Sequence, residues 1–266
     1  MTVRIDIEQV LREKAPDLHL PKFVVSYLKK IAHQDEMNDF LEVHGDERDY
    51  VFIDHVVHDL LQCDATIEGL NNIPKTNEPL LFVSNHPLGG LDGMIIALML
   101  HGARQRELKV VVTDFLMYMR PLENLFVPVN KTGAQSRDYA RRQIEMWESD
   151  ADVLSFPAGT CARKENGRVT EQPWTKSFVQ KARCYKRTIV PIRFEGQNSP
   201  FFYNLALWRK RLGIKTNIER LYLVDEMFAA KGKTFKIHVC APVEWQSLDN
   251  SLTPQQWADK IREMTL

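Results

Sequence analysis

Residues 79–101 read PLLFVSNHPLGGLDGMIIALMLH, and this stretch decides the fold. Its first apolar run, 79–84, predicts a buried β-strand, and the apolar run at its end predicts a covering helix. Pro87, Gly89 and Gly90 stand between the two runs, where they prevent one continuous helix and predict a bent loop. A strand, a loop and a helix in this order are typical of a parallel sheet.

The same alternation of strand-like and helix-like segments continues toward the C-terminus. Strands are expected at 79–84, 108–113, 125–129, 153–156, 188–194 and 234–240. Helices are expected at 92–101, 136–148, 174–186, 201–212 and 254–264. We therefore predict an α/β fold over 66–266, with a mixed, largely parallel sheet covered by helices. A helical segment over 1–65, broken at Pro16 and Pro21, is expected to precede it.

A helix expected at about 47–62 carries two pairs of residues at four-residue spacing, Asp54 with His58 and His55 with Asp59. Residues four apart on a helix are close enough to share a metal ion or a proton. The apolar positions of this segment nevertheless account for it as an ordinary amphipathic helix. We therefore expect no metal site here.

Composition excludes several classes of protein. The 266 residues include 35 Lys and Arg and 35 Asp and Glu, so the formal net charge is zero. A nucleic-acid binder held by phosphate contacts needs a basic excess, so no nucleic-acid partner is expected. The four cysteines lack zinc or disulfide-framework spacing, which predicts reduced thiols and no structural metal. A secretory signal and an apolar run of about 20 residues are both missing, so we expect a cytoplasmic chain that meets a membrane from one side.

The loop between the first strand and its helix contains His86 and Asp92. On one continuous helix these residues would be separated by about 240° and could not touch. A bent loop can instead fold Asp92 back beneath His86, where a carboxylate fixes the imidazole tautomer and leaves the other nitrogen free to accept a proton. The spacing taken alone favours a structural hydrogen bond to the backbone over a catalytic role.

A second loop, 155–164, also follows a predicted strand. Gly159 lets the backbone approach a ligand, Thr160 can donate a hydrogen bond, and Arg163 and Lys164 can hold an anion. One loop that offers a base and another that offers an anion clamp suit group transfer to or from a phosphorylated or carboxylated molecule.

In the residues of these two loops, the chain resembles the PlsC-type glycerolipid acyltransferases, which transfer fatty-acyl groups to lysophosphatidic acid and related acceptors. The matching motifs stand in family order over roughly 66–245: Asn85-His86 with Asp92, 125–129 with Lys131, Phe156-Pro157 with Gly159-Thr160, and 189–192. The resemblance implies that His86 and Asp92 are catalytic. The candidate substrate-binding residues are Asn85, Gly89, Gly90, Lys131, Gly159, Thr160, Arg163 and Lys164.

Three departures from the family pattern bear on the acceptor. One extra residue separates His86 from Asp92, Ala158 replaces the family's Glu, and Cys161 stands where its Arg would be. The chain is most similar to a bacterial subgroup labelled hemolysins, which includes O-acyltransferases that complete glycine and ornithine lipids. The resemblance thus implies an N-(3-hydroxyacyl) amino-acid acceptor, an acyl-ACP or acyl-CoA co-substrate, and no cofactor.

Both substrates carry long chains, so we expect a peripheral enzyme on the inner face of the cytoplasmic membrane. The segments 201–215 and 21–41 are the two candidate membrane-docking segments, and the basic stretch 174–187 could receive an acyl carrier protein or coenzyme A. Loop N–H groups near Gly89-Gly90 or Gly159-Thr160 are candidate donors to the reaction's oxyanion.

Four alternatives remain open from the sequence. Three are functions: acylation of lysophosphatidic acid, hydrolysis by the same His–Asp pair, and a non-enzymatic, membrane-perturbing hemolysin-like role. The fourth is an alternative mechanism, covalent catalysis on Cys161 with a lowered pKa.

Overall fold

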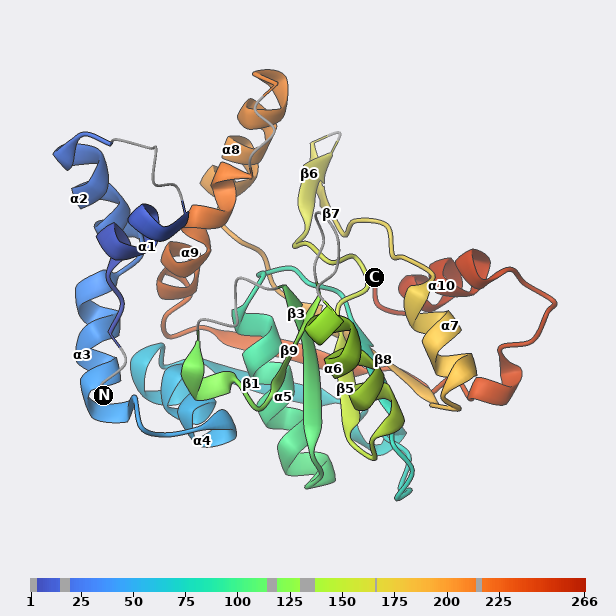
Figure 1. Ribbon diagram of the computed structural model, residues 1–266. Helices are drawn as coiled ribbons and strands as arrows, with labels where there is room; N and C mark the ends of the chain where they lie inside the picture. The colour runs from blue at the N-terminus through green and yellow to red at the C-terminus, as the bar shows by residue number, and fades with distance from the viewer. Residues whose placement is uncertain (1–3, 15–19, 114–118, 130–136, 166, 214–216) are drawn as a thin grey trace.

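The computed structural model describes residues 4–14, 20–113, 119–129, 137–165, 167–213 and 217–266 (Figure 1). The α-helices are α1 (Ile7–Lys14), α2 (Lys22–Ile31), α3 (Gln34–His44), α4 (Asp49–Asp54), α5 (Leu91–Arg104), α6 (Arg137–Glu148), α7 (Ser177–Cys184), α8 (Pro200–Arg211), α9 (Leu223–Ala229) and α10 (Pro254–Glu263). The strands are β1 (Asp64–Glu68), β2 (Leu81–Ser84), β3 (Leu108–Thr113), β4 (Phe126–Val129), β5 (Asp152–Ser155), β6 (Arg163–Glu165), β7 (Arg168–Thr170), β8 (Ile189–Glu195) and β9 (Thr234–Val239). Shorter helical pieces are the π-helix η1 (His55–Leu60) and the 3₁₀ turns η2 (Leu70–Asn72), η4 (Arg120–Leu122), η5 (Ile218–Tyr222) and η6 (Trp245–Ser247).

Seven strands form the main sheet in the order β1-β9-β8-β2-β5-β3-β4. All neighbours pair in parallel except β8 and β9, which pair antiparallel. Strand β2 lies in the middle, with Leu81 in register with Val153 on one side and with Ile189 on the other. All four β2 residues are buried, as expected for a central parallel strand covered on both faces. The α/β fold with a mixed, largely parallel sheet is confirmed.

Alternate residues of β2 enter two cores on opposite faces of the sheet. Leu81 and Val83 pack with α6, α7 and α10, whereas Phe82 packs with α3, α4, η1 and α5. Figure 1 shows α1–α4 to the left of the sheet and α7 with α10 to the right. The boundary expected between residues 65 and 66 falls inside β1, and helices from before it share a core with α5.

The six expected strands and five expected helices are all present, with small shifts at their ends. Sequence periodicity missed β1, α9 and the β6–β7 hairpin. Strand β1 is mostly exposed, and the hairpin strands have three residues each, so neither carries an apolar signal. Arg163 and Lys164, expected in a loop, belong to β6. The helix expected at 47–62 is divided into α4 and η1, and the expected break at Pro16 lies outside the described residues.

Among the described residues, no helix combines the length and apolar character needed to cross a membrane.

Candidate active site

The first functional loop connects the end of β2 to the start of α5. Gly89 has φ +85°, a left-handed conformation that favours glycine. A Cβ added there would lie 3.0 Å from Leu223 Cδ2 and 3.4 Å from Cys161 Cβ, so the loop packs closely against both residues. Ala162 also donates its N–H to the His86 carbonyl at 3.1 Å. The first and second loops are therefore fixed against each other at the carboxyl ends of neighbouring strands.

Asp92 is the centre of this loop. Its fully buried carboxylate accepts a hydrogen bond from His86 Nδ1 at 3.1 Å and from the backbone N–H groups of 88–90 and Gly93 at 2.9–3.4 Å. Burial by itself raises the pKa of the Asp92 carboxyl, but the His86 ring and the donated bonds outweigh it, so the pKa lies below its ordinary value. Asp92 is therefore ionised and holds the proton of His86 on Nδ1, which leaves Nε2 as the basic nitrogen.

The His86 ring keeps part of its surface in contact with solvent, because the side chain is 17% exposed. It stacks on Phe156 from the second loop, with ring centroids 4.2 Å apart. A packed face and a hydrogen-bonded Nδ1 together fix the orientation of the ring. The predicted His–Asp juxtaposition is thus present in the structure.

Asn85 binds the backbone of a neighbouring strand. Its side-chain amide donates to the Phe194 carbonyl at 2.9 Å and accepts from the Phe194 N–H at 2.7 Å. Both polar ends of this side chain anchor the loop to β8. The structure gives Asn85 a positioning contact where the sequence predicted a substrate contact.

The Gly89 and Gly90 amides, one of the two candidate sets of oxyanion donors, point into their own loop. Both amides donate to the Asp92 carboxylate, because a buried charge at a helix start takes the nearest N–H groups. The Gly159 N–H likewise donates to the Phe156 carbonyl at 2.8 Å, closing a turn. These amides shape the two loops.

Arg163 is held by protein groups. Its guanidinium donates to Thr160 Oγ1 at 3.2 Å, Cys161 Sγ at 2.9 Å and Glu219 Oε1 at 3.2 Å. The fully buried Glu219 also pairs with Arg209 Nε at 2.8 Å. Two arginines thus share one buried carboxylate, and the cluster of Arg163, Arg209 and Glu219, which we call the arginine cluster, carries one net positive charge.

The other two cations predicted to bind substrate are Lys164 and Lys131. Lys164 donates from Nζ to Asn204 Oδ1 at 3.4 Å near the surface. Lys131 lies outside the described residues.

Cys161 is buried against this cluster. Burial raises the pKa of its thiol and outweighs the opposing effect of Arg163. A raised thiol pKa is the opposite of what a nucleophilic cysteine needs, so the covalent hypothesis loses its premise.

Sequence reasoning missed a second buried carboxyl group beside His86. Glu171 accepts from the Trp174 indole N–H at 3.2 Å and from the His86 backbone N–H at 3.4 Å. Burial raises the pKa of Glu171, despite these bonds. An acidic residue three positions before a tryptophan is a weak signal, and the contact with His86 joins residues 85 positions apart.

Comparison with known proteins gives four matches. A family model described as acyltransferase matches residues 9–265. The lyso-glycine lipid O-acyltransferase of Bacteroides thetaiotaomicron is 44% identical over 262 residues, covering 98% of this chain and 96% of that protein. The protein of the same name from Phocaeicola vulgatus is 43% identical over 264 residues, covering 98% of this chain and 93% of that protein. The crystal structure of the 1-acyl-sn-glycerophosphate acyltransferase PlsC from Thermotoga maritima aligns over 97% of this chain and 85% of that chain, with a TM-score of 0.47 and 16% identity.

Proposed function

Because this chain belongs to the acyltransferase family and is an enzyme that transfers acyl groups to lipids, we propose that it acylates the hydroxyl of an N-(3-hydroxyacyl) amino-acid lipid at a membrane surface. The acyl donor is a thioester, acyl-ACP or acyl-CoA. The observation that carries the chemistry is the hydrogen bond between His86 and the fully buried Asp92.

The proposed reaction needs one base and no acyl-enzyme. His86 Nε2 accepts the proton of the acceptor hydroxyl as its oxygen attacks the thioester carbonyl, and Asp92 stabilises the imidazolium that forms. The tetrahedral intermediate then expels the thiolate, which takes the proton from His86. A new ester and a free thiol result, and the raised pKa of Cys161 favours this direct transfer.

The arginine cluster supports an amino-acid acceptor. Its net charge of one positive matches a single carboxylate better than a phosphate monoester, which carries about −1.5 to −2 at neutral pH. The names of the two bacterial relatives point to the same acceptor class. Lysophosphatidic acid is the second candidate acceptor.

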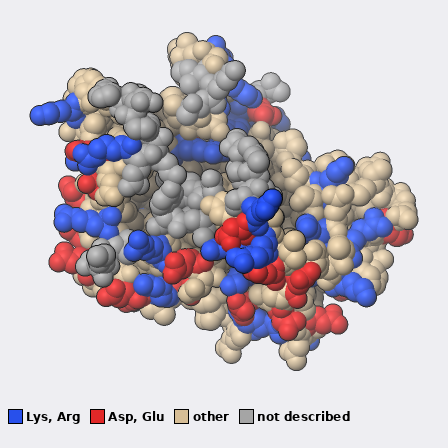
Figure 2. All heavy atoms as spheres, viewed as in Figure 1, with Lys and Arg blue, Asp and Glu red and all other residues tan. Residues whose placement is uncertain are grey.

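We place the membrane-docking surface on α2 and α8, so the two candidate segments act together. Phe23 is 75% exposed, Trp208 61% and Leu212 68%. Tyr222 lies between the helices, since its hydroxyl is 2.9 Å from the Tyr27 hydroxyl and its ring contacts Phe201. Figure 2 shows basic side chains over α2 and at the tip of α8. Exposed aromatics beside cations suit an anionic lipid surface.

The catalytic proposal is tested by acyl transfer in vesicles. The purified chain receives acyl-ACP or acyl-CoA with one of three acceptors: N-(3-hydroxyacyl)glycine, lyso-ornithine lipid or lysophosphatidic acid. We expect O-acylated amino-acid lipid as the main product and no transfer by His86→Ala with an unchanged circular dichroism spectrum. Faster acylation of lysophosphatidic acid would favour the second candidate, free fatty acid without an acceptor product would indicate a hydrolase, and an active His86→Ala would disprove the dyad.

The docking proposal has its own test. The double variant Phe23→Ser/Trp208→Ser should lose co-sedimentation with anionic vesicles. Ile144→Ser on α6 removes another exposed apolar side chain and should sediment like the wild type. Equal sedimentation of all three proteins would remove α2 and α8 from consideration.

A further inference from the structure

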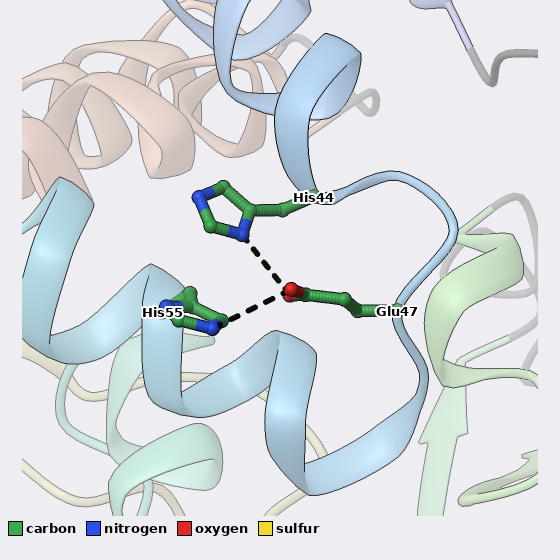
Figure 3. A group of neighbouring side chains, drawn as sticks. All are labelled: His44, Glu47 and His55. Carbon is green, nitrogen blue, oxygen red and sulfur yellow. Dashed lines mark hydrogen bonds and ion pairs between the residues drawn. The ribbon is translucent and has the colours of Figure 1, made fainter.

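A group of ligand-type side chains lies away from the active site, where α3 ends and η1 begins (Figure 3). Among the residues that the structure describes, His44, Glu47 and His55 each offer one atom, and these atoms all lie within 4.8 Å of one another. His44 is the last residue of α3, Glu47 lies in the connection to α4, and His55 is the first residue of η1. The Glu47 carboxylate lies beside the two rings and is joined to each of them by one interaction.

The distances from the two Glu47 oxygens to the two histidine rings are close to the separation of two ligands on a tetrahedral metal ion. Glu47 Oε2 is 3.1 Å from His44 Nδ1, and Glu47 Oε1 is 3.5 Å from His55 Nε2. Two ligands bound at about 2.0–2.1 Å with a tetrahedral angle are roughly 3.3 Å apart, which lies between these values. We propose that His44, Glu47 and His55 bind a divalent transition-metal ion of the zinc class, with water at the open position.

Neighbouring groups hold these side chains in place. Asp59 hydrogen-bonds His55 Nδ1, so the ring directs Nε2 toward Glu47. A carboxylate on the second nitrogen is the partner that metal-bound histidines commonly have. The His44 ring stacks on Phe40 at 4.7 Å and lies 4.3 Å from the His55 ring.

The chemistry of the donors selects the metal. Two imidazole nitrogens and one carboxylate suit zinc, whereas calcium and magnesium prefer sites built of oxygen. The Glu47 and Asp59 carboxylates together balance a charge of two. The Arg48 guanidinium is turned to the backbone carbonyls of Gly45 and Glu47, where it holds the connection without entering the group.

This grouping differs from the one the sequence suggested. The pairs His55 with Asp59 and His58 with Asp54 both form along the helix, the second at 2.9 Å. The two ligands that would bind the metal together with His55 come from α3 and the α3–α4 connection. Spacing along one helix could therefore not reveal them. The proposal departs from the expectation that this helix has no metal site.

A metal bound here would fasten α3 to η1. Both elements contribute to the core that contains α5, through residues such as Phe40 and Val56, and α5 carries Asp92 in its first turn. The metal would thus stabilise the N-terminal helices against the layer that supports the catalytic loop.

The test uses the full-length, tag-free chain after treatment with a chelator. Titration calorimetry with zinc chloride should give one ion per chain. His44→Ala, His55→Ala and Glu47→Gln should each weaken binding at least about 100-fold, and Asp59→Asn about 10- to 100-fold. His58→Ala is the matched control, because His58 lies on the same π-helix with a partner carboxylate, and it should bind like the wild type.

Thermal melting gives a second readout. Zinc should raise the melting temperature of the wild type and of His58→Ala, but not of Glu47→Gln, which retains the size of the native side chain. Wild-type binding no tighter than that of Glu47→Gln, or equal weakening by His58→Ala, would overturn the proposal.

Discussion

The loop at 85–92 and the segment at 156–171 meet at His86. Each contains one buried carboxyl group, and the pKa values of the two groups shift in opposite directions. Asp92 is fully buried and accepts five hydrogen bonds, all from residues between 86 and 93, and the pKa of its carboxyl is lowered. Glu171 is slightly less buried and accepts two, and burial raises the pKa of its carboxyl. The charge of the His86 ring and the hydrogen bonds donated to Asp92 therefore lower the pKa of Asp92, although its carboxyl is the more deeply buried of the two.

The largest expected effect comes from removing the charge of Asp92. Asn in its place cannot accept from all the donors that surround the carboxylate and does not favour an imidazolium. We expect Asp92→Asn to lower kcat by about 10⁴, as for other carboxylate–histidine pairs. Steady-state acyl transfer measures this effect, and a loss below tenfold in a folded variant would contradict the role given to Asp92.

Glu219→Gln should have the next largest effect, on stability. Its carboxylate is fully buried between Arg163 and Arg209, whose side chains are mostly buried. Removal of one member of a buried ion cluster typically costs about 3–5 kcal/mol. Urea denaturation measures the free energy of unfolding, with Glu263→Gln on the exposed face of α10 as the control. Equal destabilisation by both variants would show that the arginine cluster contributes no more to the free energy of unfolding than an exposed carboxylate does.

The opposite pKa shifts predict opposite pH dependences. The lowered pKa of Asp92 means that its ionised form stabilises the fold above the ordinary value of 3.8, and this contribution is lost as the pH falls through the folded pKa. Glu171 has a raised pKa, so its contribution is present below the ordinary value of 4.5 and is lost as the pH rises through the folded pKa.

Glu171→Gln sharpens this contrast. Gln keeps the size of the side chain and can still accept from Trp174, but it does not ionise. The free energy of unfolding of the variant, relative to that of the wild type, should therefore increase as the pH rises from about 4.5. We expect this difference to be smaller than the destabilisation caused by Glu219→Gln. Unfolding curves at several pH values measure it, and parallel pH profiles for the two proteins would refute the raised pKa.

Cys161→Ala should have the smallest effect. The thiol is a buried neutral group that accepts from Arg163 at 2.9 Å, so its loss removes one hydrogen bond and leaves the dyad intact. We expect measurable acyl transfer by the variant. Complete loss of turnover with a normal circular dichroism spectrum would contradict direct transfer and favour a covalent mechanism on Cys161.

Prediction from the sequence succeeded where the information is local. The strand, loop and helix at 79–101 follow from apolar runs and from Pro87, Gly89 and Gly90. The approach of His86 to Asp92 follows from the same loop, because both residues lie within seven positions. Conversely, the direction of the glycine amides could not be predicted, since it depends on which acceptor the folded loop buries.

Sequence by itself therefore determined the α/β fold, the family resemblance and the position of the His–Asp pair. Tertiary structure decided which distant polar groups meet: Arg163 pairs with Glu219 56 positions away, Glu171 accepts from the backbone of His86 85 positions away, and the His44 ring contacts the His55 ring across a change of helix. The physical reason is that periodicity records which face of an element is buried, whereas a buried charge requires a particular partner. That partner is fixed when distant elements pack together.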